Sequence, residues 1–154
     1  DMCYREVTAG DTIDIDPEVT VEVLWPDGSS VQGMDVNDAS IVLRIVYGQT
    51  SFLLCADAGK GAQARIREAF PGLKADVIKI PHHGAANALD EKFLAVTAPK
   101  DAVISVGRNN KFGHPALAVL DFLASKGIKI YRTDLDGTIT VQAGKSGYKI
   151  KTSK

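Results

Sequence analysis

The chain has 154 residues, of which 45% are hydrophobic and 24% are charged, and its formal net charge is −1 at pH 7. This length and composition predict a single domain over residues 1–154 and exclude a disordered chain. The small net charge excludes a general attraction to polyanions, so any nucleic acid must be bound by a local patch. The apolar runs are strand-sized, well short of the ~20 residues that cross a bilayer, and we expect a soluble piece.

The first part of the sequence predicts a sheet followed by a helix. Apolar and β-branched residues favour strands at residues 19–24, 41–47 and 51–55. Gly48-Gln49 indicates a turn between the last two strands, which makes them a hairpin. After Asp57 the composition favours a helix, which Pro71-Gly72 ends. A helix therefore follows the acidic end of the third strand.

From residue 76 onward, strand and helix patterns alternate, which predicts layered α/β packing. Strands are expected at 77–80 and 102–106, and helices at 90–96 and 115–126. The last helix has Pro115 in its first turn and Gly127 as its stop. Its apolar side is expected to contain Leu117, Leu120 and Leu123.

Three short strands are expected at the end of the chain, at residues 129–132, 138–143 and 148–151. Asp136-Gly137 predicts a hairpin-type turn before the second of these strands. This end is also basic, with lysines at positions 145, 149, 151 and 154. A solvated strand face is the favoured interpretation of these lysines, and contact with nucleic acid is the alternative.

Residues that bind metal ions follow two of the predicted strands. Asp57 comes after one apolar run, and its carboxylate suits Zn²⁺ or Mn²⁺, although a role as helix N-cap is equally compatible with its position. His82 and His83 follow another run and precede Gly84, which permits a sharp turn. Because adjacent side chains of an extended segment point to opposite sides, we expect one histidine to ligate a given ion. The alternative is a pair of solvated loop histidines.

His114 lies in a polar loop between the strand at 102–106 and the last helix. Arg108, Asn109 and Lys111 add hydrogen-bond donors to this loop, and helix N-termini attract anions, so phosphate recognition is physically reasonable. Taken alone, an ordinary loop histidine is the favoured interpretation. Nearer the N-terminus, Asn37 and Ser40 would orient a ligand or, as the favoured alternative, stabilise a turn.

Four blocks together resemble the metallo-β-lactamase-like domain of the ComEC family of competence proteins. They are Leu53-Leu-Cys-Ala-Asp57, Ala75-Asp-Val-Ile-Lys-Ile-Pro-His-His-Gly84, the segment Ala102 to Pro115 and Ile130-Tyr-Arg-Thr-Asp-Leu-Asp-Gly137. Asn37-Asp-Ala-Ser-Ile-Val-Leu-Arg44 fits the same pattern. The sequence contains no P-loop, no Gly-x-Gly-x-x-Gly after a strand and no Gly-x-Ser-x-Gly, so nucleotide-fold and α/β-hydrolase motifs are missing.

The resemblance implies an α/β (α+β) fold, the metallo-β-lactamase-like αββα sandwich, with one or two divalent metal ions, Zn²⁺ or Mn²⁺. It implies a metal-dependent hydrolase that cleaves DNA phosphodiesters, with single-stranded DNA expected. Asp57 would be the bridging carboxylate and His83 a metal ligand, with His82 as an alternative ligand or substrate contact. His114 would act as donor or general acid, helped by Arg108.

The sequence departs from the family pattern in two places. The His-x-His-x-Asp-His block that supplies most ligands is absent, and Cys55-Ala56 replaces the usual Thr-Gly before the acidic residue. We therefore expect mainly the C-terminal half of the domain, cut from a longer chain, which alone binds metal poorly and is inactive. We expect its partners to be DNA, the rest of its domain and a membrane channel, with this domain on the outer side of the cell membrane. An uncovered apolar face would also permit self-association.

Two other functions are compatible with the same residues. One is a stand-alone hydrolase of the superfamily, such as a phosphocholine esterase-like enzyme. The other is a non-catalytic module that binds the transported strand or has a structural role.

Overall fold

The computed structural model describes residues 4–28 and 36–154. A six-stranded mixed sheet has the order β1-β2-β3-β4-β5-β6, and β7 and β8 form a separate two-stranded sheet. The strands are β1 Val19–Trp25, β2 Val42–Tyr47, β3 Thr50–Leu54, β4 Val77–Lys79, β5 Asp101–Ile104, β6 Lys129–Arg132, β7 Ile139–Gly144 and β8 Gly147–Thr152. The helices are α1 Lys60–Ala69, α2 Glu91–Thr97, α3 Leu117–Ser125, α4 Thr133–Asp136 and the 3₁₀ helix η1 Pro81–Gly84.

The first three strands pair antiparallel, as the sequence predicts. Tyr47 pairs with Thr50 across the two-residue turn at Gly48-Gln49, which confirms the hairpin. Gly48 has φ +56, and a Cβ there would lie 2.5 Å from the carbonyl oxygen of Lys145. This position therefore requires glycine both for its conformation and for the close approach of a distant segment.

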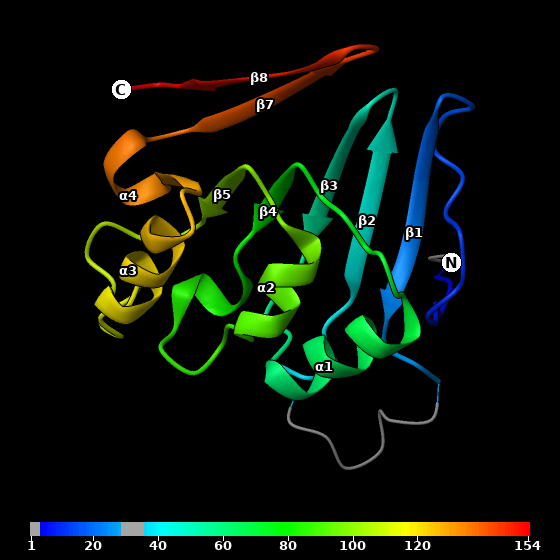
Figure 1. Ribbon diagram of the computed structural model, residues 1–154, viewed down its shortest axis with the longest axis horizontal. Coiled ribbons are helices and arrows are strands. Elements are labelled where there is room, and N and C mark those ends of the chain that lie inside the picture. Colours follow the sequence, from blue (N-terminus) through cyan, green and yellow to red (C-terminus); the bar gives the residue numbers. More distant parts are fainter. Residues whose placement is uncertain (1–3, 29–35) are drawn as a thin grey trace.

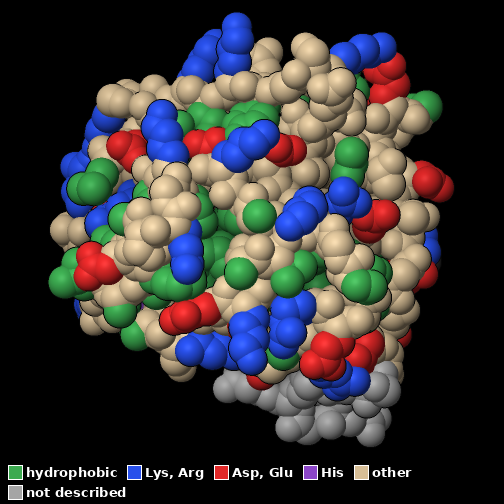
Figure 2. Space-filling view, viewed as in Figure 1, with side chains coloured by type: hydrophobic (Ala, Val, Ile, Leu, Met, Phe, Trp, Pro, Cys, Tyr) green, Lys and Arg blue, Asp and Glu red, His purple; other side chains and the backbone are tan. Residues whose placement is uncertain are grey.

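Strands β3, β4, β5 and β6 are parallel to one another. Helices α1, α2 and α3 connect successive parallel strands, and Figure 1 shows the helices in front of the sheet. The core lies between these two layers, where Ile78 and Ile104 of the sheet and Ile66, Phe93 and Leu123 of the helices are at most 1% exposed. Figure 2 shows Lys and Arg side chains over α1, the helix that carries Lys60, Arg65 and Arg67.

The topology brings the ends of the parallel strands together at two edges. We call the edge that follows β3, β4, β5 and β6 the carboxyl edge, and the edge at which these strands begin the amino edge. Three of the loops at the carboxyl edge contain the predicted site residues. In open α/β sheets this edge is the usual location of ligands.

Helix α2 confirms its sequence prediction, whereas α3 differs in its start and in its buried side. The Asp90 side chain caps α2 by accepting hydrogen bonds from the N–H groups of Lys92 and Phe93. Helix α3 begins at Leu117, after Pro115, and Leu117 is 71% exposed. A spacing of three residues drifts by about 60° per step around a helix, so Val119 and Leu123, four apart, form the buried stripe instead.

The prediction of a hairpin turn at Asp136-Gly137 is wrong. Residues Thr133–Asp136 form the single turn α4, and β6 and β7 lie in different sheets. The turn is held locally, because Asp134 pairs with Arg132 at 2.6 Å and Asp136 accepts a hydrogen bond from the Arg132 N–H at 2.7 Å. The true hairpin connects β7 to β8 through residues 145 and 146.

The β7–β8 hairpin is attached to the main sheet by contacts far apart in sequence. The Gln49 N–H donates to the carbonyl of Lys145 at 3.2 Å, and the Lys145 amine pairs with Glu18 at 2.9 Å. The Tyr148 hydroxyl donates to Asp101, the first residue of β5. Within residues 4–28 and 36–154, none of the helices has the length and apolar character that spanning a membrane requires.

Candidate metal and phosphate site

The carboxyl edge brings together Asp57 and the three histidines predicted from sequence. His83 Nε2 lies 3.9 Å from Asp57 Oδ1. The ring centroid of His82 is 6.3 Å from that of His83 and 5.9 Å from that of His114. Four polar side chains from three strand ends therefore form one continuous cluster.

The backbone around this cluster is unusual. The described residues other than glycine with positive φ are Ala56, His82, His83 and Ala98, and the first three of them belong to the cluster. The prediction of an extended His82-His83 segment is thus wrong. The His82 N–H donates to the carbonyl of Ala56 at 3.0 Å, and this bond between two strand ends sets the left-handed turn. Consequently, the alternating direction of side chains in an extended segment cannot be used to decide which of the two histidines is the metal ligand.

Asp57 is not the N-cap of the helix that follows it. Gly59 is the N-cap of α1, and its N–H donates to Oδ1 of Asp38 at 2.8 Å. The Asp57 N–H donates to the hydroxyl of Ser40 at 3.3 Å, so Ser40 supports the backbone of the acidic residue. The Asp57 carboxylate is therefore available for a ligand. Sequence reasoning missed Asp38, although it lies between the two residues that it singled out.

His83 has the hydrogen-bonding pattern of a metal ligand. Its Nδ1 lies 2.6 Å from the carbonyl oxygen of Ser105, at the end of β5. Because a carbonyl only accepts hydrogen bonds, Nδ1 carries a hydrogen, and in the neutral ring the lone pair is therefore on Nε2. Nε2 is the atom near Asp57. Metal-binding histidines in proteins are typically fixed in this way by a carbonyl or carboxylate on the other nitrogen.

Lys79 is a further polar residue of the cluster that the sequence analysis did not select. Its ammonium group donates to the carbonyl of Ala56 at 3.0 Å. Burial lowers the pKa of Lys79, and the negative charge of Asp57 partly opposes this effect. A lysine within an otherwise apolar strand was the signal available in the sequence. Cys55, in the segment that follows β3, is fully buried, and burial raises the pKa of its thiol to about 12, so the thiol is protonated at neutral pH.

A buried glutamine joins the loops on both sides of the cluster. Gln63 of α1 is 0% exposed, and its amide nitrogen donates to the carbonyls of Ala58 and Ala88 at 2.8 and 2.5 Å. Its amide oxygen accepts from the Asp90 N–H at 2.9 Å. All three bonds go to backbone groups of the loops after β3 and β4. Gln63 therefore fixes the separation of these loops.

The loop after β5 places His114 beside His82. The Asn110 amide nitrogen donates to the carbonyl of His114 at 2.7 Å, and its oxygen accepts from the His114 N–H at 2.9 Å. Arg108 points toward α4, because its Nε donates to the carbonyl of Asp134 at 3.3 Å. Asn109 and Lys111 lie on the exposed side of this loop. Of the predicted phosphate contacts, only His114 lies against the other histidines in this arrangement.

A cleft of about 230 Å³ opens beside Asp57 and His82. Asn37, Asp38, Lys60 and Asn87 are among the residues that line it. Among residues 4–28 and 36–154, however, no group of three or more His, Cys, Asp or Glu side chains is arranged to hold a metal ion. The described part of the chain thus supplies a pair of potential ligands rather than a complete set.

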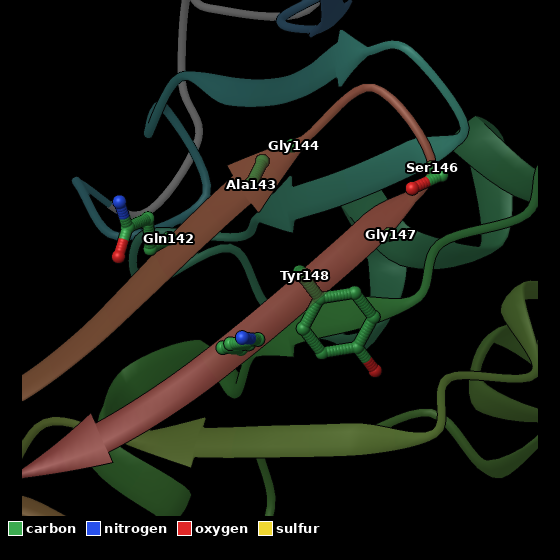
Figure 3. Close-up of a pocket in the computed structure, with 7 residues that line it drawn as sticks. Gln142, Ala143, Gly144, Ser146, Gly147 and Tyr148 are labelled. Carbon is green, nitrogen blue, oxygen red and sulfur yellow. The ribbon is translucent and has the colours of Figure 1, made fainter.

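A second, larger hollow lies along the β7–β8 hairpin. Its volume is about 390 Å³. Figure 3 shows the residues that line it, with Tyr148 extending from β8 toward the main sheet. Burial and the hydrogen bond to Asp101 raise the pKa of the Tyr148 hydroxyl, so it stays protonated at neutral pH. Lys149 is the charged residue among those that line the hollow. None of the site residues predicted from the sequence lines this hollow, and the carboxyl edge remains the candidate site.

Comparison with curated proteins identifies relatives whose names refer to competence and recombination. The chain is 37% identical to ComE operon protein 3 of Bacillus subtilis (strain 168) over 138 residues, which cover 90% of this chain and 17% of the relative. It is 34% identical to competence protein ComA of Neisseria gonorrhoeae over 132 residues, or 85% of this chain and 19% of the relative. Recombination protein 2 of Haemophilus influenzae is 30% identical over 107 residues, or 68% of this chain and 13% of the relative.

The chain is a homologue of one segment of these proteins. It spans less than a fifth of the length of the curated relatives that it matches, and no protein-family model matches it. The similarities support the competence-protein family that the sequence resembles.

A solved structure shows the fold. The CmlA β-hydroxylase, in a mutant form, matches 83% of this chain and 32% of its own chain with a TM-score of 0.53 and 14% identity. CmlA has the metallo-β-lactamase fold, and the predicted fold class is thereby confirmed. At this identity the likeness concerns the fold alone.

Proposed function

We propose that this chain contributes the downstream part of a metal-dependent phosphodiesterase site in a protein for DNA uptake. The observation that carries the proposal is the geometry of His83, with Nδ1 held by the Ser105 carbonyl and Nε2 3.9 Å from Asp57. A core histidine would have both nitrogens satisfied by the protein. Here one nitrogen is fixed and the other faces a carboxylate, which suits a shared cation.

The donor chemistry fits zinc or manganese. Imidazole nitrogen and carboxylate oxygen bind both ions, and two ligands of one tetrahedral zinc lie about 3.3 Å apart. The observed 3.9 Å is therefore close to the required spacing. An ordinary structural or catalytic zinc site uses three or four protein ligands. The remaining ligands would come from another segment, of the His-x-His-x-Asp-His type expected for the family.

The bound ion would supply a water of lowered pKa and polarise the phosphoryl group. The protein would do the rest at the carboxyl edge. Asp57 and His83 would hold the ion, His82 would be a second ligand or a substrate contact, and His114 would donate a proton or hydrogen bond to the phosphate. Arg108, Lys111 and Asn109, on the loop that carries His114, would contact phosphates further along the strand.

The proposed substrate is DNA, in single-stranded form. Support comes from the names of the relatives, which refer to competence and recombination. We further propose that the remainder of the domain and a membrane channel belong to the same parent protein, with this domain on the outer side of the membrane. A non-catalytic, DNA-binding role is the second candidate, because the described residues form only a pair of metal ligands.

The test is cleavage of a 5′-labelled single-stranded oligonucleotide by the protein that contains this chain together with the rest of its domain, with Mn²⁺ or Zn²⁺ added. Replacing a metal ligand should reduce cleavage at least about 100-fold, because ligands and their supports each affect affinity or activity strongly. The variants are Asp57→Asn and His83→Gln. Asp121→Asn, an exposed position on α3, is the matched control and should retain activity. Equal cleavage by all variants would remove the site assignment.

A further inference from the structure

Phe112 presents its ring to solvent beside the proposed site. The side chain is 81% exposed, and its ring stacks on that of His114 with centroids 5.9 Å apart and an interplanar angle of 19°. A single exposed apolar side chain is common on protein surfaces, but this ring is distinguished by its stacking on a histidine of the proposed site. The arrangement therefore extends the histidine cluster by one flat apolar surface.

The loop holds the backbone that carries this ring in a defined position. The Asn110 side-chain oxygen accepts hydrogen bonds from the N–H groups of Phe112 and His114, at 3.2 and 2.9 Å. The Asn110 amide nitrogen donates to the carbonyls of Gly107 and His114, at 3.2 and 2.7 Å. Four bonds from one side chain thus order the backbone on both sides of Phe112. A preorganised ring loses little entropy when a ligand stacks on it.

The charge of the loop favours an anionic ligand. Residues 105–115 contain Arg108 and Lys111 but no aspartate or glutamate, although the whole chain has a net charge of −1. Both cationic residues are exposed. An exposed aromatic ring on a loop that also carries cations is a combination with which proteins bind single-stranded nucleic acids, because bases stack on the ring while the cations contact phosphates. Paired bases in a duplex are not available for this contact.

We propose that Phe112 is a stacking platform for an unpaired base of the nucleic acid whose phosphate faces His114. This inference rests on the proposed function, since it names the side chain that would recognise the unpaired bases of the same substrate. Phe112 would select single-stranded over double-stranded DNA, and Arg108 and Lys111 would add affinity without selection. A lipid surface would also accept an exposed phenylalanine, and the experiment below separates the two partners.

The first measurement uses tryptophan as a reporter. Trp25, the single tryptophan of the chain, is 1% exposed and should not respond to a ligand. In a Phe112→Trp variant of the 154-residue chain, an unpaired oligonucleotide of about 12 nucleotides should quench the new emission by stacking. A Leu117→Trp variant, at another exposed apolar position, is the control and should not be quenched. Equal quenching in both variants, or a blue shift of the emission with phosphatidylglycerol vesicles and no response to DNA, would overturn the inference.

The second measurement compares dissociation constants by fluorescence anisotropy in EDTA, so that neither metal nor cleavage is needed. Phe112→Ala should weaken binding of the normal oligonucleotide about tenfold, and Phe112→Tyr should restore it. An abasic oligonucleotide of the same length, which has no bases to stack, should bind Phe112→Ala and Phe112→Tyr with the same dissociation constant. If Phe112→Ala binds the normal oligonucleotide as tightly as the original chain does, the inference fails. If Phe112 stacks on the oligonucleotide but the complete domain shows no metal-dependent cleavage, the proposed phosphodiesterase function fails and the stacking inference stands.

Discussion

The two edges of the parallel strands use similar residues in opposite ways. At the amino edge, Asp76 accepts a hydrogen bond from Lys100 at 2.9 Å and two from Ser51, and Asp101 accepts one from Tyr148. At the carboxyl edge, the contact between Asp57 Oδ1 and His83 Nε2 is longer, at 3.9 Å. The acidic groups of the amino edge are satisfied within the protein, whereas the cluster at the carboxyl edge has atoms left for a ligand.

The backbone shows the same contrast. Ala56, His82 and His83 adopt positive φ at the carboxyl edge, a conformation that costs non-glycine residues about 1 kcal/mol or more each. Such strain persists where surrounding structure fixes it, and it is concentrated at functional sites. Here the surrounding bonds are those of Gln63, Lys79 and the His82 N–H. We infer that the contacts at the amino edge raise the free energy of unfolding and that the backbone strain at the carboxyl edge lowers it.

The largest expected effect comes from filling the space beside Gly84 at the carboxyl edge. Gly84 has φ +78, and an added Cβ would lie 2.8 Å from Cβ of Pro115, the residue after His114. Gly84→Ala should lower the free energy of unfolding by about 3 kcal/mol, from left-handed strain plus overpacking. Urea denaturation measures this change.

Gly72→Ala is the matched control for that substitution. Gly72 has φ +88 but nothing within 4 Å of the added Cβ. Gly72→Ala should lower the free energy of unfolding by only about 1 kcal/mol, from left-handed strain alone. Equal losses at the two glycines would mean that the contact between the His83 and His114 loops is not tight.

An intermediate effect is expected at the amino edge, from Asp76→Asn. Burial raises the pKa of Asp76, but the hydrogen bonds from Lys100 and Ser51 outweigh burial and leave it below the ordinary value of 3.8. A depressed pKa contributes stability above the ordinary value, and this contribution is lost as pH falls through the folded-state pKa. The substitution should cost about 1 kcal/mol at pH 7, and the difference should shrink below about pH 4. A difference that is independent of pH down to acid unfolding would contradict this account of the amino edge.

The smallest effect is a gain at the carboxyl edge. Ala56 has φ +44 and occupies the position where the family pattern has glycine. Ala56→Gly should raise the free energy of unfolding by about 0.5 kcal/mol, because relief of left-handed strain slightly exceeds the entropy cost of glycine. Thermal or urea unfolding measures the gain. A clear loss of stability would show that Ala56 is not strained.

The sequence predicted the elements whose signals are local. The Gly48-Gln49 turn, the helix expected at 90–96 and the strands before Asp57 and His82 all follow from spacing and composition, and they bring the four site residues to one edge. The resemblance to the metallo-β-lactamase-like domain added the fold, which the structural comparison confirms.

The errors concern places where specific side-chain bonds or contacts between distant segments outweigh the preference of the local sequence. Asp136-Gly137 has a strong hairpin signal, yet the bonds of Arg132 to Asp134 and Asp136 make a helical turn there. The His82-His83 segment is not extended, because His82 bonds to Ala56, 26 residues earlier. Asp38, Gln63 and Lys79 were missed for the same reason, since each acts on backbone groups of another segment. The ligand assignments themselves stay predictions.

The most direct test of the central claim is the long-range ¹H–¹⁵N spectrum of the His83 imidazole during a Zn²⁺ titration of the chain. We predict that His83 carries its hydrogen on Nδ1 before metal is added, as the Ser105 carbonyl requires, and that the Nε2 signal then shifts with Zn²⁺. Asp57→Asn should weaken this response. A hydrogen on Nε2, or an Nε2 signal unmoved by Zn²⁺ while other histidines respond, would contradict the claim that Asp57 and His83 form half of a metal site.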